Sequence, residues 1–164
     1  MSAQFERTIG DLWASLSLPA PIFSERPTII LTVETTNVLL EESRDGRHIN
    51  LSSSAGHLAR DPISRSMQIH DLLASNLASL TSLAATVSIE DTGTTEAEVI
   101  VKAVYPYRIG KIGALTTAVQ SVLALAQAHV MKLRGSSARP TGYRSSQAER
   151  NLALQEAHSL IFRP

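Results

Sequence analysis

Asp91, Thr92 and Gly93 form the string in this sequence that is most similar to a catalytic motif of a known enzyme class. An Asp-Thr-Gly triplet builds the catalytic loop of aspartic proteases, where two such loops bring their carboxylates together to share one proton. A dimer could supply the second copy, but those proteases carry apolar residues just before the Asp, whereas Glu90 stands here. The same residues also suit a hairpin turn, because Gly accepts a left-handed backbone and Asp bonds the backbone beyond it. The sequence favours the turn, and an aspartic-protease-like dimer that uses Asp91 stays as an alternative.

The other residues that could bind phosphate or metal lack the spacing that such sites need. Gly110 and Lys111 precede a helical pattern, but a phosphate-binding loop requires Ser or Thr after the Lys, and Ile112 stands there. The five histidines show no metal-binding spacing, and cysteine is absent, which excludes disulfides, thiolate ligands and cysteine nucleophiles. We therefore predict that the protein is not an enzyme and has no catalytic residue, no cofactor and no metal site.

The composition is that of one soluble globular domain. The chain has 164 residues, of which 43% are hydrophobic and 18% charged, and its 15 basic and 15 acidic side chains cancel. Such neutrality removes the usual electrostatic reason for binding nucleic acid or an anionic membrane surface. No apolar run approaches the roughly 18 residues that span a bilayer, and residues 1–13 lack the apolar core of a secretory signal. We expect a cytoplasmic protein with no membrane insertion.

Hydrophobic periodicity predicts an α+β fold, an antiparallel twisted sheet flanked by helices. Apolar residues at helical spacing alternate along the chain with short, β-branched stretches of period two. The predicted helices cover residues 5–16, 69–80 and 112–133, and the predicted strands cover 28–34, 37–42, 47–53, 83–90 and 97–103. Asp45-Gly46 marks a hairpin, and residues 52–66 indicate a polar loop. The expected order is α-βββ-α-ββ-α.

The last thirty residues differ in character from the rest. Gly135 suits the position after a helix end, and residues 135–145 have the Gly, Ser and Pro content of a linker. Ser146 and Glu149 fit a capping box that opens a short final helix through Leu160. We divide the chain into a domain over 1–134 and a linker with a short helical tail over 135–164. Truncation after Gly135 is expected to leave the domain folded.

Three strings carry a resemblance to a known family. Residues 51–58 contain a Gly-Leu-like loop after a strand, residues 72–76 read Leu-Leu-Ala-Ser-Asn, and residues 87–93 run from a strand into a polar turn. Together with the order of the elements, these strings make residues 5–134 resemble the class I type III secretion chaperones, the family of the Tir chaperone. The neutral charge and the longer C-terminal extension are departures, and they leave a multi-cargo member open.

The resemblance implies a function for the chain. Members of that family form homodimers in the bacterial cytoplasm, and they hold the unfolded N-terminal region of secreted effectors extended and export-competent without ATP. The implied partners are effector proteins and a second copy of the chain, with the secretion ATPase as a further candidate, and the implied setting is virulence. The alternative within this setting is a non-catalytic adaptor or export-control component of the secretion machinery, which would bind a folded partner.

Two sets of residues are candidate binding sites. Ile30 and Leu39 are apolar residues on the less apolar face of their strands, so we expect them to line a cargo groove, with Trp13 and Leu16 on its wall. For each of these residues, an ordinary place in the core remains the alternative. The family resemblance suggests the second helix and the next strand as the dimer interface, through the following residues: Leu73, Leu77, Val87 and Ile89.

Overall fold

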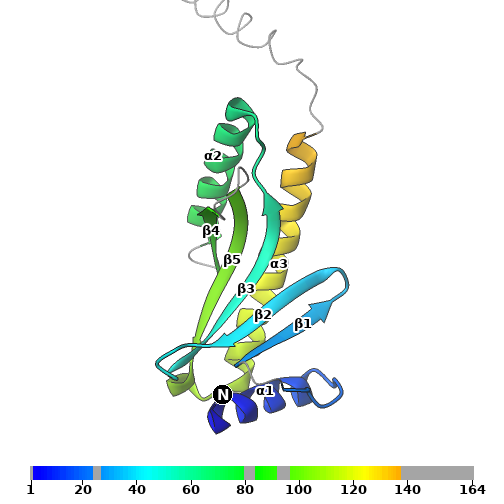
Figure 1. Ribbon diagram of the computed structural model, residues 1–164, viewed down its shortest axis with the longest axis vertical. Coiled ribbons are helices and arrows are strands. Elements are labelled where there is room, and N and C mark those ends of the chain that lie inside the picture. Colours follow the sequence, from blue (N-terminus) through cyan, green and yellow to red (C-terminus); the bar gives the residue numbers. More distant parts are fainter. Residues whose placement is uncertain (1, 24–26, 80–83, 92–96, 138–164) are drawn as a thin grey trace, which may run out of the picture.

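The computed structural model describes residues 2–23, 27–79, 84–91 and 97–137, with side chains through residue 134. These residues form a five-stranded antiparallel sheet with three α-helices and a short 3-10 helix (Figure 1). In chain order the elements are α1 (Ala3–Ser15), β1 (Thr28–Val33), β2 (Thr36–Glu42), β3 (His48–His57), α2 (Pro62–Ser79), β4 (Thr86–Asp91), β5 (Ala97–Pro106), η1 (Tyr107–Ile109) and α3 (Ile112–Ser137). The predicted fold class and element order are confirmed, with η1 as an addition.

The sheet has the strand order β1-β2-β3-β5-β4, and only one of its faces carries the core. Strand residues alternate between the two faces, as period-two geometry requires. Val38 and Leu40 of β2, Ile49 of β3 and Val99 and Val101 of β5 are all fully buried. Figure 1 shows α3 running behind β3 and β5, with α1 across one end of the sheet and α2 beside β4 at the other. The opposite face of β3 and β5 carries no helix among the described elements.

A polar junction fixes the start of α1 against the sheet. The Ser2 hydroxyl accepts from the Phe5 amide as the helix N-cap, and it donates to Glu42 at the end of β2. Tyr107 of η1 also donates to Glu42, at 3.2 Å. Burial disfavours the charged form of Glu42, but these hydrogen bonds outweigh it and lower its pKa. Three segments far apart in sequence are thereby joined at one carboxylate.

Three predicted boundaries are wrong. Residues 52–57 continue β3 because Ser53 and Ala55 alternate inward beneath α3, so the expected polar loop is much shorter. Helix α2 begins at Pro62, where the Asp61 carboxylate accepts from the Ser64 amide at 2.7 Å as an N-cap would. At the other end of the domain, α3 continues through Gly135 to Ser137. The tail beyond residue 137, with its predicted helix, lies outside the described residues.

Helix α3 also corrects the expectation that no segment is apolar enough to span a membrane. Its residues Ile112–Arg134 meet the length and composition of a span, with a mean hydropathy of 1.2. The same stretch is the helix that covers the sheet, and 44% of its most apolar window is buried inside the protein. Packing against the sheet therefore accounts for its apolar content, as it does for many core helices.

Candidate binding surfaces on the second helix and the open sheet face

Helix α2 turns a largely polar face toward the rest of the protein. Gln68 and Ser79 are buried, and Ser75 and Asn76 are partly buried beside them, with Leu72 buried and Ile69 partly buried as the apolar residues of this face. Gln68 accepts from the Ala59 amide at 2.7 Å, so hydrogen bonds help to hold this face in place. Such a face supplies little of the hydrophobic free energy that normally holds an amphipathic helix in place.

The outer face of α2 carries the apolar residues instead. Ile63 and Leu77 are 74% and 73% exposed, and Met67 and Leu73 are at least half exposed. Positions 63, 67, 70, 74 and 77 recur at helical spacing, so Ile63, Met67 and Leu77 share one side of the helix with His70 and Ala74, and Leu73 lies at its margin. We call the set Ile63, Met67, Leu73 and Leu77 the α2 stripe. Large apolar residues that gather on a solvent-facing side of a helix make it a candidate interaction surface.

Asn76 explains how α2 stays attached despite its polar inner face. Its side-chain amide donates to the Val87 carbonyl at 2.8 Å, and its side-chain oxygen accepts from the Val87 amide at 2.7 Å. Because β4 is an edge strand, the Val87 N–H and C=O on its outer side have no neighbouring strand to pair with, and Asn76 supplies their hydrogen-bond partners. The last residue of the Leu-Leu-Ala-Ser-Asn string thus has a structural role that spacing alone did not reveal.

The predicted dimer residues divide into two groups. Leu73 and Leu77 are exposed on the α2 stripe, and Ile89 of β4 is 40% exposed. Val87, by contrast, is buried in the hydrophobic core of its own chain. Val87 is therefore available to a partner only through its backbone edge, which Asn76 already occupies.

The predicted cargo residues also divide, because the sheet separates them. Ile30 and Leu39 are direct cross-strand neighbours on the open face, where Ile30 is 58% exposed and Leu39 partly so. Trp13 is buried in the core with Ile29 and Leu31, on the other side of β1, and Leu16 packs against that core. The structure therefore does not bring Trp13 to the side of Ile30, because alternation along β1 turns Ile30 away from the core in which Trp13 lies.

Beyond Ile30 and Leu39 the open face becomes polar. Leu39 pairs with Ser52, which in turn pairs with Lys102, and Lys102 forms an ion pair with Glu90. Val104 of β5, 56% exposed, is an apolar residue next to Lys102 on this face, and it pairs with Asn50, which in turn pairs with Glu41. We call Ile30 and Leu39 the β1–β2 patch.

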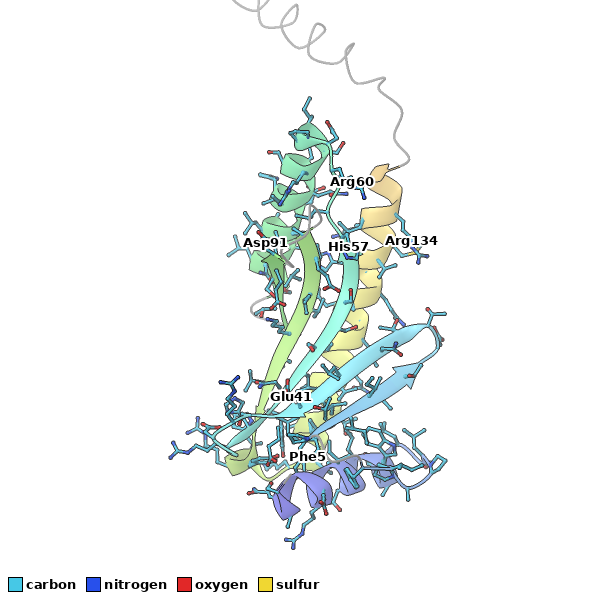
Figure 2. The ribbon with its side chains drawn as sticks, in the orientation of Figure 1. Phe5, Glu41, His57, Arg60, Asp91 and Arg134 are labelled. Carbon is cyan, nitrogen blue, oxygen red and sulfur yellow. The ribbon has the colours of Figure 1, made fainter. Side chains whose placement is uncertain are left out.

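Asp91 has the position that the turn interpretation expects. It is the last residue of edge strand β4, it is exposed, and it pairs across the ladder with Ala97 (Figure 2). Thr92 and Gly93 lie outside the described residues. Within the described part of the chain, no group of three or more His, Asp or Glu side chains is arranged to hold a metal ion.

Comparison with known proteins yields matches at the level of structure. No family model and no curated protein matches the sequence. A chain in the HopA1–SchA chaperone–effector complex aligns with a TM-score of 0.61 at 13% identity, covering 78% of this chain and 94% of that one. A chain in the heterodimeric ExoU–SpcU complex of the type III secretion system of Pseudomonas aeruginosa aligns with a TM-score of 0.59 at 18% identity, covering 76% and 97%.

The chain has the class I type III secretion chaperone fold. The recognition made from the Leu-Leu-Ala-Ser-Asn string and the element order is confirmed at that level. YbjN from E. coli, a proposed transcription regulator, also aligns, with a TM-score of 0.55 at 15% identity, covering 76% of this chain and 88% of that one. The secretion-chaperone fold therefore does not determine function alone, and the two surfaces described above have to be considered with it.

Proposed function

We propose that this protein is a cytoplasmic, ATP-independent chaperone that binds the unfolded N-terminal region of type III secreted effectors as a homodimer. The observation that carries the proposal is the secretion-chaperone fold combined with an exposed α2 stripe. One neighbour in structure is a chaperone–effector complex, and another is a type III secretion chaperone, SycH, in complex with a fragment of YscM2. We propose no catalytic role, and the hairpin position of Asp91 supports that choice.

The α2 stripe is the surface that we assign to the dimer. A two-fold interface buries the same patch from both copies, and a stripe of four large apolar residues is self-complementary in that sense. Leu73 and Leu77 lie at the C-terminal end of the stripe and are 63% and 73% exposed, with Ile89 at the neighbouring edge of the sheet. The polar inner face of α2 fits this role, because a helix with its apolar side outward is stabilised when a partner covers it.

The β1–β2 patch is the surface that we assign to cargo. An extended segment can lay alternate apolar side chains against a sheet face and order as it binds. Ile30 and Leu39 lie side by side in adjacent strands and far from the α2 stripe, so one dimer would present two copies of the patch. An adaptor that binds a folded component of the secretion machinery is the second candidate function.

Capture of cargo separates these candidates. The tagged protein is isolated from its own cells, and the proteins that remain bound are identified by mass spectrometry. Each one is then divided into its N-terminal ~100 residues, a size compatible with coupled ordering on a large surface, and the remainder as matched control. The chaperone function predicts binding of the N-terminal fragment alone, without any dependence on ATP. Binding of only the folded remainder would favour the adaptor, and no secreted protein at all would contradict the proposal.

Substitution in the patch tests the assigned surface. Ile30→Asp is expected to weaken binding of the N-terminal fragment by a few kcal/mol, because it places an unpaired carboxylate against apolar cargo. Val104→Asp is the matched control, since Val104 is as exposed as Ile30 on the same face but lies on β5, separated from the β1–β2 patch by β3. Titration of both variants with the N-terminal fragment measures the difference in binding affinity. Equal losses in the two variants, or none in Ile30→Asp, would contradict the assignment to the β1–β2 patch.

A further inference from the structure

Two segments that are far apart in sequence meet at the end of the sheet that carries α1. The turn between β2 and β3 lies beside η1 there, and the Tyr107 amide donates to the Arg47 carbonyl at 3.0 Å (Figure 1). Residues 43–48 and 106–111 together carry four arginine and lysine side chains against one carboxylate, that of Asp45. The two segments therefore concentrate a net charge of +3 at one end of a chain that is neutral as a whole.

Two arginines of these segments have no side-chain partner in the described part of the chain. Arg47 and Arg108 are exposed, and neither guanidinium group forms a hydrogen bond or an ion pair with a described residue. The carboxylates beside them accept hydrogen bonds from other groups. Asp45 accepts from the Arg47 amide at 3.1 Å within its own turn. Glu42 accepts from Tyr107 at 3.2 Å. Both guanidinium groups can therefore bind an anion that another molecule supplies.

An open pocket of about 520 Å³ lies at this end of the molecule, against the end of β5. Val104, Pro106 and Tyr107 supply its apolar surface, and Val104 is 56% exposed. Arg47 and Arg108 line the pocket from the turn and from η1. Its other lining residues are the following: Gln4, Asp45, Gly46 and His48. The pocket thus combines an apolar surface with two arginines, and the described residues contribute a single carboxylate to its lining.

We propose that this pocket binds an acidic segment of a partner protein, one that places a large apolar side chain between Asp or Glu residues. The apolar side chain packs on Val104 and Pro106, and the flanking carboxylates pair with Arg47 and Arg108. Arginine suits this role because its planar fork binds a carboxylate through two parallel hydrogen bonds. An apolar centre with arginine and tyrosine around it is also the composition that protein interfaces favour.

The surroundings of the pocket favour a protein segment over a long polyanion. Helix α1, whose Gln4 lines the pocket, carries Glu6 and Asp11 against one arginine, so the positive charge does not extend along it. Nucleic acids and anionic membranes bind instead to basic surfaces that continue over many contacts. A short acidic segment matches a positive charge of this extent.

The polar groups of the pocket favour a protein segment over a small anion as well. Sites for small ligands are enclosed, and they fix the ligand through precisely placed polar groups. Here both arginines are exposed, and the buried hydroxyl of Tyr107 already donates to Glu42. A partner that brings its own apolar side chain uses the exposed surface of Val104, which a small anion would leave in solvent.

Selection from a library of displayed random peptides tests the proposal with the full chain. We expect the selected peptides to carry Asp or Glu on both sides of a large apolar residue. Arg47→Glu combined with Arg108→Glu should weaken their binding by about tenfold or more. The matched control is Arg44→Glu with Lys111→Glu, which changes the net charge equally at the same end but outside the pocket lining. This control should weaken binding by about threefold or less.

The following outcomes would overturn the proposal. Selected peptides without acidic residues, or a library without specific binders, would show that the pocket does not recognise an acidic segment. Equal losses in the two double variants would show that the net charge of this end attracts the peptides and the pocket does not. Binding of an oligonucleotide or of phosphatidylserine vesicles, lost only in the Arg47→Glu, Arg108→Glu chain, would assign the arginines to a polyanion.

A second pair of variants tests the apolar part of the pocket. Val104→Asp should weaken binding of the selected peptides by about tenfold, because it places a carboxylate against their apolar side chain. Met131→Asp, at an exposed position of α3 outside the pocket, should leave the binding unchanged. Equal affinities of the two variants would contradict the proposal. The α2 stripe lies at the other end of the sheet (Figure 1) and the probes are not secreted proteins, so the outcome is independent of the proposed chaperone function.

Discussion

Helices α2 and α3 belong to the same fold, yet they distribute polarity in opposite ways. Helix α3 buries Leu115, Val122 and Ala126 completely against the sheet and exposes mostly small or polar residues. Helix α2 directs Gln68 and Ser79 inward and leaves its apolar stripe in solvent. Packing inside one chain is sufficient to explain α3, whereas the exposed stripe on α2 is explained by the partner that we propose.

Replacing an apolar residue by Asp should therefore have a different effect in each helix, and this difference is the largest that we expect. Val122→Asp places a carboxylate in the closed core and should lower the free energy of unfolding by about 4 kcal/mol or more, enough to unfold the protein. Leu77→Asp should leave the chain folded and shift it from dimer to monomer, because the charge lies in the shared interface. Urea denaturation and light scattering measure the two outcomes. A Leu77→Asp protein that stays dimeric would contradict the proposed interface on α2, and a folded Val122→Asp protein would contradict the burial of α3 in the core.

The hydrogen bonds between α2 and β4 give a second test of how α2 is held in place. Asn76→Ala removes both hydrogen bonds to Val87 and leaves its edge groups unpaired, so we expect a loss of about 1–3 kcal/mol in the free energy of unfolding. Asn37→Ala is the matched control, because Asn37 accepts one exposed bond from Thr32 and should lose no more than about 0.5 kcal/mol. Chemical denaturation of both variants decides the point. Equal small losses would show that α2 does not depend on Asn76.

The seam between α2 and α3 predicts a smaller, pH-dependent effect. His129 of α3 is buried, its Nε2 lies 3.4 Å from the Ser75 hydroxyl, and its Nδ1 has no partner within the described residues. Burial, with Lys132 nearby, lowers its pKa, so the unfolded chain binds a proton more readily than the folded one. Stability from this residue should be complete above pH ~6.5 and fall below it, by at most about 1.4 kcal/mol per pH unit.

His129→Leu isolates that contribution. The variant should remain stable at pH 7.5, because it removes a buried atom without a partner, and its stability should decline less than the wild type between pH 7 and pH 5. The lowered pKa of Glu42 acts at lower pH and is common to both proteins. Parallel pH profiles for the wild type and the variant would contradict the assignment to His129.

Periodicity predicted most of the fold and the exposure of Ile30 on the face opposite the core. The alternation that buries Ile29 and Leu31 and exposes Ile30 follows from sequence alone, because strand geometry fixes the two faces. Nothing in the local pattern shows that Trp13 joins the core on the other side of β1, since that depends on where α1 crosses the sheet. Val87 has the same apolar character as Ile89, and only the tertiary position of α2 separates a buried residue from an exposed one. The sequence predicts too short a β3, because Ser53 and Gly56 are residue types typical of loops. Their place in a strand depends on packing beneath α3, which the local sequence does not show.

The particle mass in solution tests the central claim, that the α2 stripe is a homodimer interface, most directly. Light scattering on the full chain at micromolar concentration should report twice the chain mass of 17.7 kDa, and Leu77→Asp measured beside it should report the mass of a single chain. A wild-type mass of one chain would show that the stripe is not covered by a second copy, and it would contradict the dimeric chaperone that we propose.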